Sequence, residues 1–349
     1  MPAVGKGATI AVTGANGFIG AWVCSELLAQ GFKVRAVVRD ASNVDKHGFL
    51  KTLPGAEQGL TLCDGNLVPG GYDAAFAGVD GVVHTVAVVE VLDSSDAENK
   101  ILKPALEGTK IALEAAAKAQ VKRFVVLSSV AAVQSILGKS DDHTFTEKDW
   151  NEWSALKTDA YGFAKTQQER AVWAFVADAK PSFDAVAVNP TVVLGPCLCK
   201  AHTKSSAVLV REVLYGNTMN DYFATFVDVR DVAAGIAAAL VRPAAGGERF
   251  LLVGDEPPMS TLALGPIAQA ALPQYALGSK PKVWSWALWL LAQVGYVTPF
   301  QYAVATRPIR LSNAKAKEAL GVAPRPLAET VKQTAESMVA GGWVKTAKK

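Results

Sequence analysis

The chain has 349 residues and a mass of 36.7 kDa, roughly twice the ~150 residues of an average domain. Apolar residues make up 50% and charged residues 19%, a composition that excludes disordered, collagen-like and coiled-coil chains. The formal net charge is +3 and the only basic run is the terminal Lys345-Thr-Ala-Lys348-Lys349, which is too little positive charge to suggest a nucleic-acid partner.

The N-terminus and the cysteines favour a reducing compartment. Residues 1–7 lack the charged head and long apolar core of a signal peptide. The four cysteines, at positions 24, 63, 197 and 199, have no disulfide-framework spacing, and the chain is large enough to fold without crosslinks. We therefore expect reduced thiols and a cytoplasmic protein.

Short β-branched runs alternate with longer helical patterns through most of the chain. They predict strands near residues 9–13, 33–38, 60–63, 81–86, 123–128, 185–189 and 249–253, with helices near 18–30, 96–119, 159–178 and 229–241. Strands that are almost wholly apolar and are each followed by a helix need crossover connections and burial on both faces. The pattern predicts an α/β fold with a doubly wound, Rossmann-type parallel sheet.

A glycine triplet lies between the first strand and the first helix: Gly14, Gly17 and Gly20. The first glycine allows the tight turn, the second allows the approach of a pyrophosphate, and the third allows the helix to pack on the strand. The N-terminus of the helix attracts the phosphate. The motif therefore predicts NAD(P) binding by Gly14, Asn16, Gly17, Phe18, Ile19 and Gly20.

The end of the second strand bears on the choice between NAD and NADP. Arg39 follows the strand about 20 residues after the last glycine, where an arginine accommodates the 2′-phosphate of NADP. Lys46, in the next loop, supplies a second cation. In the alternative reading Arg39 is a surface charge and Asp40 binds the ribose hydroxyl of NAD. We favour NADP(H), held by Arg39 and Lys46.

Polar side chains at two further elements predict a catalytic centre. Tyr161 and Lys165 are four residues apart in a helix pattern, so their side chains share one face. A tyrosine needs a nearby cation to exchange a proton near neutral pH, because its ordinary pKa is about 10. The strand near 123–128 ends in Ser128 and Ser129 at the carboxyl edge of the sheet, where a hydroxyl can hold a substrate oxygen. The set predicts a proton donor, its cation and a serine.

Beyond Pro190 the pattern becomes a series of loops rich in glycine and proline, typical of a region that shapes a substrate pocket. Residues 226–254 still show the strand and helix pattern of the first part. We therefore predict an NADP-binding domain, residues 1–190 with 226–254 returning to it. Residues 191–225 and 255–349 would form a smaller, mostly helical substrate lobe.

For two groups of side chains that could bind a metal or exchange a proton, we predict structural roles instead. Cys197, Cys199 and His202 are three soft donors in a short loop, and without a fourth donor they predict an ordinary loop and no metal site. His84 lies in an apolar strand, where a buried histidine with a hydrogen-bond partner is expected rather than a catalyst.

Residues 283–306 are apolar enough to raise the question of a membrane. Their uninterrupted part, 283–292, is about half of the ~20 residues that a bilayer crossing needs. A helix packed within the lobe is the preferred reading, and docking at a membrane interface is the alternative. The tryptophans at 284, 286 and 289 are accordingly assigned to packing or to an apolar pocket wall.

These motifs resemble those of extended short-chain dehydrogenases/reductases of the dihydroflavonol 4-reductase and cinnamoyl-CoA reductase group. The matching stretches are TGANGFIG (13–20), VRAVVRD (34–40), AENKILKPALEGTK (97–110), KRFVVLSS (122–129), YGFAK (161–165), NPTVVLGP (189–196) and FVDVRDVA (226–233). The resemblance implies that Ser129 is the catalytic serine, that Tyr161 is the general acid, and that Lys165 also binds the nicotinamide ribose. It further implies cofactor contacts from Asn66, Leu67, Val86, Pro190 and Val193.

The chain departs from this group at two places. The cinnamoyl-CoA reductase signature NWYCYGK is replaced by Thr158-Asp-Ala-Tyr-Gly-Phe-Ala-Lys165, and Gln134 stands where dihydroflavonol reductases usually carry Asn or Asp. Ser128 and Gln134 are therefore kept as candidate substrate contacts, and neither a flavonoid nor a cinnamoyl thioester is named.

The leading hypothesis is an NADPH-dependent oxidoreductase that reduces the carbonyl group of an apolar or aromatic aldehyde or ketone, with Tyr161 donating the proton. The tail from residue 280 also resembles 3β-hydroxysteroid dehydrogenase-like proteins and sugar-epimerase-like reductases. The first alternative is therefore oxidation of a hydroxysterol or a sugar nucleotide, with membrane association. A non-catalytic NADP sensor is the second alternative, and the set of Ser129, Tyr161 and Lys165 argues against it. Monomer and dimer both stay open.

Overall fold

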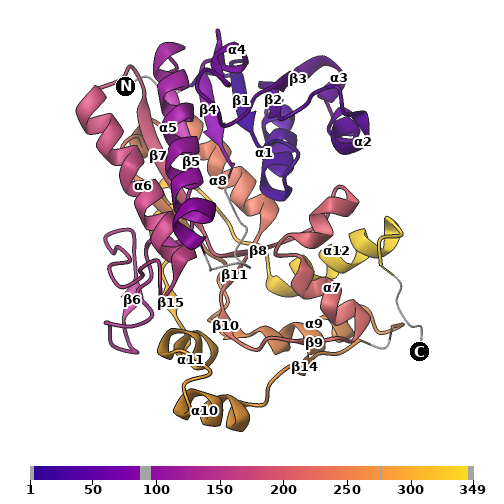
Figure 1. Ribbon diagram of the computed structural model, residues 1–349. Helices are drawn as coiled ribbons and strands as arrows, with labels where there is room; N and C mark the ends of the chain where they lie inside the picture. The colour runs from indigo at the N-terminus through magenta and orange to yellow at the C-terminus, as the bar shows by residue number, and fades with distance from the viewer. Residues whose placement is uncertain (1–3, 87–95, 276, 345–349) are drawn as a thin grey trace.

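The apolar runs of the sequence form one parallel sheet of seven strands, in the order β12-β7-β5-β4-β1-β2-β3 (Figure 1). This computed structural model describes residues 4–86, 96–275 and 277–344. The strands are β1 (Thr9–Thr13), β2 (Lys33–Val38), β3 (Leu60–Asp64), β4 (Gly81–His84), β5 (Arg123–Leu127), β7 (Asp184–Pro190) and β12 (Arg249–Leu252). The chain runs outward from β1 to β3, returns to β4 on the other side of β1, and continues to β12. The predicted doubly wound fold is confirmed.

Helices cover both faces of the sheet. On one face α1 (Phe18–Ala29) packs against α8 (Val229–Val241), and on the other α5 (Lys103–Lys118) packs against α6 (Ala160–Ala179). Successive strand residues alternate between the two cores, because side chains of a strand point to opposite faces. Ile10 and Val12 join the core beneath α1, whereas Ala11 joins the core beneath α5.

Short elements connect these layers at their edges. They are α2 (Val44–His47), η1 (Gly48–Thr52), α3 (Ala56–Gly59) and α4 (Asp73–Phe76), then the π-helical turn η3 (Glu98–Leu102) that leads into α5, and η4 (Val130–Ala132) after β5. The turn η4 begins where β5 ends, so the residues between them lie at the carboxyl edge of the sheet. That edge is where open α/β sheets bind ligands.

Most of the remaining elements gather beyond the carboxyl edge (Figure 1), whereas η6 (Pro243–Ala245), which leads into the start of β12, and the neighbouring η8 (Ala316–Leu320) do not. Helices α7 (Val208–Tyr215), α9 (Leu264–Ala271) and α12 (Leu327–Ala340) pack on one another. Short strand pairs join the loops: β8 (Val192–Leu194) with β11 (Phe226–Asp228), β9 (Thr218–Met219) with β14 (Lys280–Pro281), β10 (Phe223–Ala224) with β13 (Met259–Ser260), and β6 (Thr144–Phe145) with β15 (Arg310–Leu311). Further turns are η5 (Lys200–Lys204) and η7 (Thr261–Ala263). The division into two domains stays a prediction.

Residues 283–306 form two short helices, α10 (Ser285–Gln293) and α11 (Pro299–Thr306), near the surface. The assignment of the three tryptophans to packing or a pocket wall is wrong, because Trp284, Trp286 and Trp289 are 62%, 69% and 51% exposed. Neighbouring parts of the lobe do not cover them. In the part of the chain that the structure describes, no helix has both the length and the apolar character needed to cross a membrane.

Candidate active site

The turn from β1 into α1 has the shape of a dinucleotide cradle. Gly14 has φ +65°, and a Cβ there would lie 2.9 Å from the Thr85 hydroxyl oxygen. A Cβ on Gly20 would lie 2.3 Å from the Gly14 carbonyl oxygen, so helix and turn approach closely only because both residues are glycines. The N-cap residue of α1 is Gly17, which has no side chain to occupy the free amide groups. These features fit a pyrophosphate at the helix N-terminus.

His202 links this turn to the lobe, a role that sequence reasoning missed. Its Nε2 lies 3.1 Å from the Asn16 carbonyl oxygen, while Nδ1 accepts a hydrogen bond from the Leu198 N–H at 3.2 Å. The ring also packs edge-on against Phe18. Burial lowers the pKa of His202, so the neutral ring makes both hydrogen bonds. No group of three His, Cys, Asp or Glu side chains among the described residues is arranged to hold a metal ion.

Two exposed cations lie after β2, Arg39 directly behind the strand and Lys46 in α2. Arg39 and Lys46 are exposed, and their charged groups make no hydrogen bond or ion pair with any described residue. Asp40 accepts hydrogen bonds from both the hydroxyl and the N–H of Ser42, at 2.6 and 3.1 Å, which keeps this carboxylate within its own turn. These hydrogen bonds lower the pKa of Asp40. The arrangement fits a 2′-phosphate better than a ribose hydroxyl held by Asp40.

Two of the residues assigned to the cofactor by resemblance line a shallow hollow. Leu67 and Val86 lie there with His84 of β4, with Gly108 and other residues of α5, and with Gln168 of α6. A Cβ on Gly14 would be 3.2 Å from a Val86 methyl, so this hollow adjoins the glycine turn. The other residues of this group lie elsewhere at the same edge: Asn66 is exposed after β3, Pro190 ends β7, and Val193 is buried in β8.

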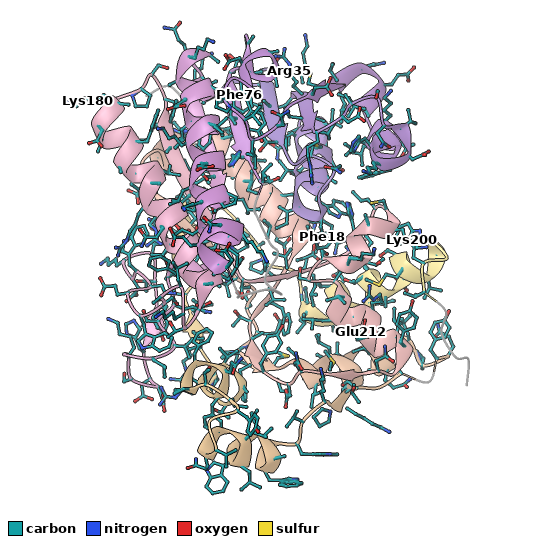
Figure 2. The ribbon with its side chains drawn as sticks, viewed as in Figure 1. Phe18, Arg35, Phe76, Lys180, Lys200 and Glu212 are labelled. Atoms are coloured by element: carbon teal, nitrogen blue, oxygen red, sulfur yellow. The ribbon has the colours of Figure 1, made fainter. Side chains whose placement is uncertain are left out.

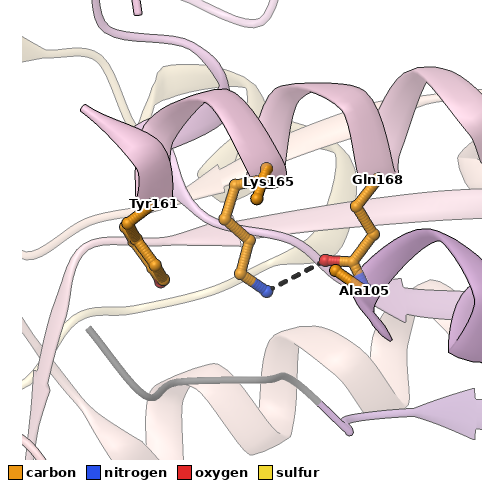
Figure 3. Close-up of a pocket in the computed structure, with 5 residues that line it drawn as sticks. Ala105, Tyr161, Lys165 and Gln168 are labelled. Carbon is orange, nitrogen blue, oxygen red and sulfur yellow. Dashed lines mark hydrogen bonds between the residues drawn. The ribbon is translucent and has the colours of Figure 1, made fainter. Parts of the chain in front are cut away.

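Tyr161 and Lys165 line a second small hollow, together with Ala105, Ala164 and Gln168 (Figure 3). Ala105 and Gln168 line both hollows, so the two adjoin. The Asp159 carboxylate caps α6 by accepting from the Gly162 N–H at 3.0 Å, which fixes Tyr161 in the first turn. Figure 3 shows the Tyr161 and Lys165 side chains on the same side of the helix, one turn apart.

The surroundings of this pair shift both pKa values. Burial lowers the pKa of Lys165 to about 8, and the negative charge of Glu169 opposes this effect. Burial raises the pKa of Tyr161, against a hydrogen bond with Ser129 that lowers it. The Lys165 ammonium donates to the Gln168 side-chain carbonyl at 3.1 Å, and Gln168 donates to the Thr109 hydroxyl at 2.8 Å. The Tyr161 hydroxyl is therefore protonated at neutral pH, next to a lysine whose pKa lies close to neutral.

His84 lies beneath the site, and it is fully buried. Its Nδ1 is 2.9 Å from the Thr13 hydroxyl. Burial and the Lys165 charge lower the pKa of His84 to about 3, so the ring is neutral at physiological pH. Its burial and its hydrogen bond agree with the expectation of a buried, hydrogen-bonded histidine.

The two serines after β5 point to different partners. The Ser129 hydroxyl accepts from the Ala131 N–H at 3.2 Å and interacts with Tyr161. The Ser128 hydroxyl is buried and donates to Glu169 at 2.5 Å. This geometry supports Ser129 as the serine of the site and does not support a substrate contact through the Ser128 hydroxyl. Gln134 is half-buried just after η4 and lines neither hollow.

A buried polar network lies directly behind the serines. Glu169, one turn after Lys165, accepts from Ser128, from Asn189 at 2.7 Å, and from the Arg249 guanidinium. Asn189 also donates to the Ser129 carbonyl at 3.1 Å. The network ties α6 to the ends of β5 and β7 and to the start of β12, so it holds Ser129 in place relative to Tyr161 and Lys165. Sequence reasoning missed Glu169 and Arg249.

The proteins that this chain resembles in sequence agree with the site described above. The family model described as "NAD dependent epimerase/dehydratase family" matches residues 10–254. "Cinnamoyl-CoA reductase 2" of Arabidopsis thaliana is 36% identical over 253 residues, which cover 70% of this chain and 73% of the relative. "Cinnamoyl-CoA reductase CAD2" of Medicago truncatula is 31% identical over 349 residues, covering 97% and 98%. The resemblance to this group of reductases is confirmed.

A solved structure agrees over nearly the whole chain. The yeast methylglyoxal/isovaleraldehyde reductase Gre2, complexed with NADPH, superposes with a TM-score of 0.78 at 26% identity, covering 96% of this chain and 100% of that one. The agreement includes the lobe beyond residue 254, outside the family match. With the glycine cradle, the tyrosine–lysine pair and these matches in agreement, the chain belongs to the NAD dependent epimerase/dehydratase family.

Proposed function

We propose that this protein reduces the carbonyl group of an apolar or aromatic aldehyde or ketone to an alcohol. The observation that carries the proposal is the hollow in which Tyr161 and Lys165 meet, with Ser129 in contact with the tyrosine. The matches to cinnamoyl-CoA reductases and to a methylglyoxal/isovaleraldehyde reductase support reduction as the direction.

The prediction of an NADP(H)-dependent oxidoreductase is confirmed by the comparisons. We propose that the glycine turn holds the pyrophosphate, that Arg39 and Lys46 bind the 2′-phosphate, and that Leu67 and Val86 face the adenosine half. When bound, NADPH supplies a hydride to the carbonyl carbon.

The chain's own residues then manage the oxygen and the proton. Ser129 donates a hydrogen bond to the substrate oxygen and holds it beside the Tyr161 hydroxyl. Tyr161 donates its proton as negative charge develops on that oxygen. The Lys165 cation stabilises the phenolate that remains, because an opposite charge nearby favours the ionised form. Ala105 and Ala164 leave apolar walls next to the pair, which suits an apolar substrate.

A turnover assay tests the proposal. Purified protein is given NADPH or NADH with dihydroflavonols, hydroxycinnamoyl thioesters, aryl aldehydes, diketones and 3-ketosteroids. We expect NADPH oxidation with at least one class, and a loss of about 10²–10⁴-fold in kcat for Tyr161→Phe, which lacks the proton donor. NADPH affinity should stay within a few-fold, because the ring remains.

Three results would contradict this proposal or part of it. Tight NADPH binding without turnover of any substrate would favour a sensor. Unchanged turnover by Tyr161→Phe would remove the tyrosine from the chemistry. A preference for NADH would overturn the assignment of Arg39 and Lys46.

All four cysteines are free thiols, and we propose a cytoplasmic location on that basis.

A further inference from the structure

Exposed apolar side chains gather around α10. Of the ten large hydrophobic side chains that are exposed among the described residues, seven lie within 14 consecutive positions, here called the α10 surface: Val283, Trp284, Trp286, Trp289, Leu290, Val294 and Tyr296. Tyr296 is 82% exposed. Monomeric proteins scatter such residues singly, and a contiguous patch marks a contact with something else.

The helix places several of these side chains in one stripe. Trp286 is three and four residues before Trp289 and Leu290, the spacing of one helix face, and all three are exposed, as is Val294 directly after the helix. Ala287, Leu288 and Leu291 turn the other way and are half-buried. The helix therefore rests on the lobe through one face and presents the other, with two indole rings, to its surroundings.

The α10 surface lies at one end of the molecule. In Figure 1 α10 is at the bottom, far from α4 and the strands at the top, and Figure 2 shows its side chains projecting outward. The adjacent α11 contacts the segment that leads into α6, because Phe300 stacks on Trp153 at 5.5 Å between ring centroids. The dinucleotide cradle is on another part of the molecule, so contact at α10 leaves it open.

The charge around this surface has one sign. From Pro257 to Lys317 the sequence holds six lysines and arginines and no aspartate or glutamate. Lys280 and Lys282, just before α10, are exposed, and their ammonium groups pair with no described carboxylate. By contrast, the guanidinium groups of Arg307 and Arg310 form ion pairs with the carboxylates of Asp141 and Asp142, at N–O distances of 3.5 and 3.9 Å respectively. Lys280 and Lys282, which lie next to the tryptophans, therefore carry positive charge that no described carboxylate neutralises.

We propose that the α10 surface docks this protein on anionic membranes, with the tryptophans at the boundary between headgroups and acyl chains. Trp and Tyr are the side chains favoured at that depth, and lysines at the rim are attracted to anionic lipid. A helix of nine residues is too short to cross the bilayer and lies in its plane. A second copy is a poorer occupant, because a two-fold contact would bring the same lysines together.

Flotation with lipid vesicles tests the proposal. We expect the full chain to float with vesicles of mixed phosphatidylcholine and phosphatidylserine, and far less with phosphatidylcholine alone. Lys280→Glu with Lys282→Glu should lower the partition coefficient on anionic vesicles by about 30-fold or more. Trp286→Ser with Trp289→Ser should lower it by at least about tenfold through lost apolar contact.

Matched variants near the strands β1 to β3 control for nonspecific effects. Val44→Ser with Val68→Ser removes two side chains that are 64% and 51% exposed, and Lys6→Glu with Lys33→Glu makes the same change of charge. Both should float as the unchanged protein does. Thermal unfolding and NADPH affinity, which should be the same in all four variants, verify that each is folded.

Three results would overturn the proposal. The first is equal flotation of the α10 variants and the control variants, and the second is no flotation of the unchanged protein. The third is a dimer in solution, measured by light scattering, that the two tryptophan substitutions convert to a monomer without any vesicle binding, which would assign the surface to a second copy. Because the variants lie outside the catalytic centre, turnover of soluble substrates reports on the reductase proposal separately.

Discussion

Lys165 is the group at the catalytic centre that titrates closest to physiological pH. Burial lowers its pKa to about 8, whereas burial raises that of Tyr161. As the pH rises through about 8, the lysine loses its charge while the tyrosine still holds its proton. We therefore expect kcat/KM for NADPH-driven reduction to be level below this pH and to fall above it, because kcat/KM reports the free enzyme.

The lysine variant checks this assignment. Lys165→Met should lower kcat/KM by about 10²-fold or more and remove the decline above pH 8. The measurement is a kcat/KM profile from pH 6 to 10 with the best substrate of the panel. A decline that persists unchanged in the variant would mean that another group, such as the substrate or Tyr161, causes it.

At the scale of elements, Glu169 connects the catalytic helix to three strands. Its partner Arg249 is buried, stacks over the Trp150 ring at 3.7 Å, and also donates to the Glu147 and Asp149 carbonyls at 2.9 and 2.7 Å. Glu169→Gln leaves the guanidinium without a countercharge, so we expect a loss of about 3 kcal/mol in the free energy of unfolding. Urea denaturation measures this.

The same variant should change the pH profile. The Glu169 charge raises the pKa of Lys165, so its removal should move the decline of kcat/KM to lower pH. A purely structural residue would leave the profile in place. Glu336→Gln is the control, because Glu336 is an exposed partner of Lys332 on α12 and should change stability by less than about 0.5 kcal/mol. A stable Glu169→Gln protein with an unshifted profile would refute the positioning role.

The elements of the sheet could be predicted from sequence, and those of the lobe could not. β1 and β2 have the predicted ends, and α8 also agrees, because apolar runs and helical periods are local signals that the parallel sheet reinforces. In the lobe, β9 and β14 have two residues each and exist only because a partner strand lies next to them. The exposure of α10 contradicted an apolar pattern that predicts burial.

The site could be predicted in part for the same reason. The glycine turn and the tyrosine–lysine pair are local motifs, whereas Glu169 and Arg249 are 80 positions apart and His202 is 186 positions from Asn16. No local pattern marks such contacts. Sequence reasoning therefore finds residues whose chemistry depends on near neighbours, and it misses those that are positioned by the folded chain.

At the scale of the whole molecule, the cofactor should stabilise the sheet and the lobe together, because His202 of the lobe contacts the glycine turn. NADPH at 100 times its Kd should raise the free energy of unfolding by about 2.7 kcal/mol. NADH at the same concentration should raise it less, because Arg39 and Lys46 find no phosphate. Chemical denaturation with each nucleotide measures the difference.

The variant pair Arg39→Ala and Lys46→Ala should abolish this preference, and Lys33→Ala, at the other end of β2, should preserve it. Stabilisation by NADH equal to that by NADPH in the unchanged protein would contradict the 2′-phosphate assignment. Two separate unfolding transitions with saturating NADPH would mean that the His202 contact does not couple the two parts.

The position of β12 in the sheet has a consequence for synthesis of the chain. β12 pairs with β7, yet about 60 residues separate them in sequence. At ribosomal rates of about 5–20 residues per second, β7 waits about 3–12 s for its outer neighbour. Until then its outer row of N–H and C=O groups is open to any extended segment nearby. The nascent protein therefore exposes this seven-residue edge during the interval, and once residues 249–252 pair with β7 the edge of the sheet is the shorter β12.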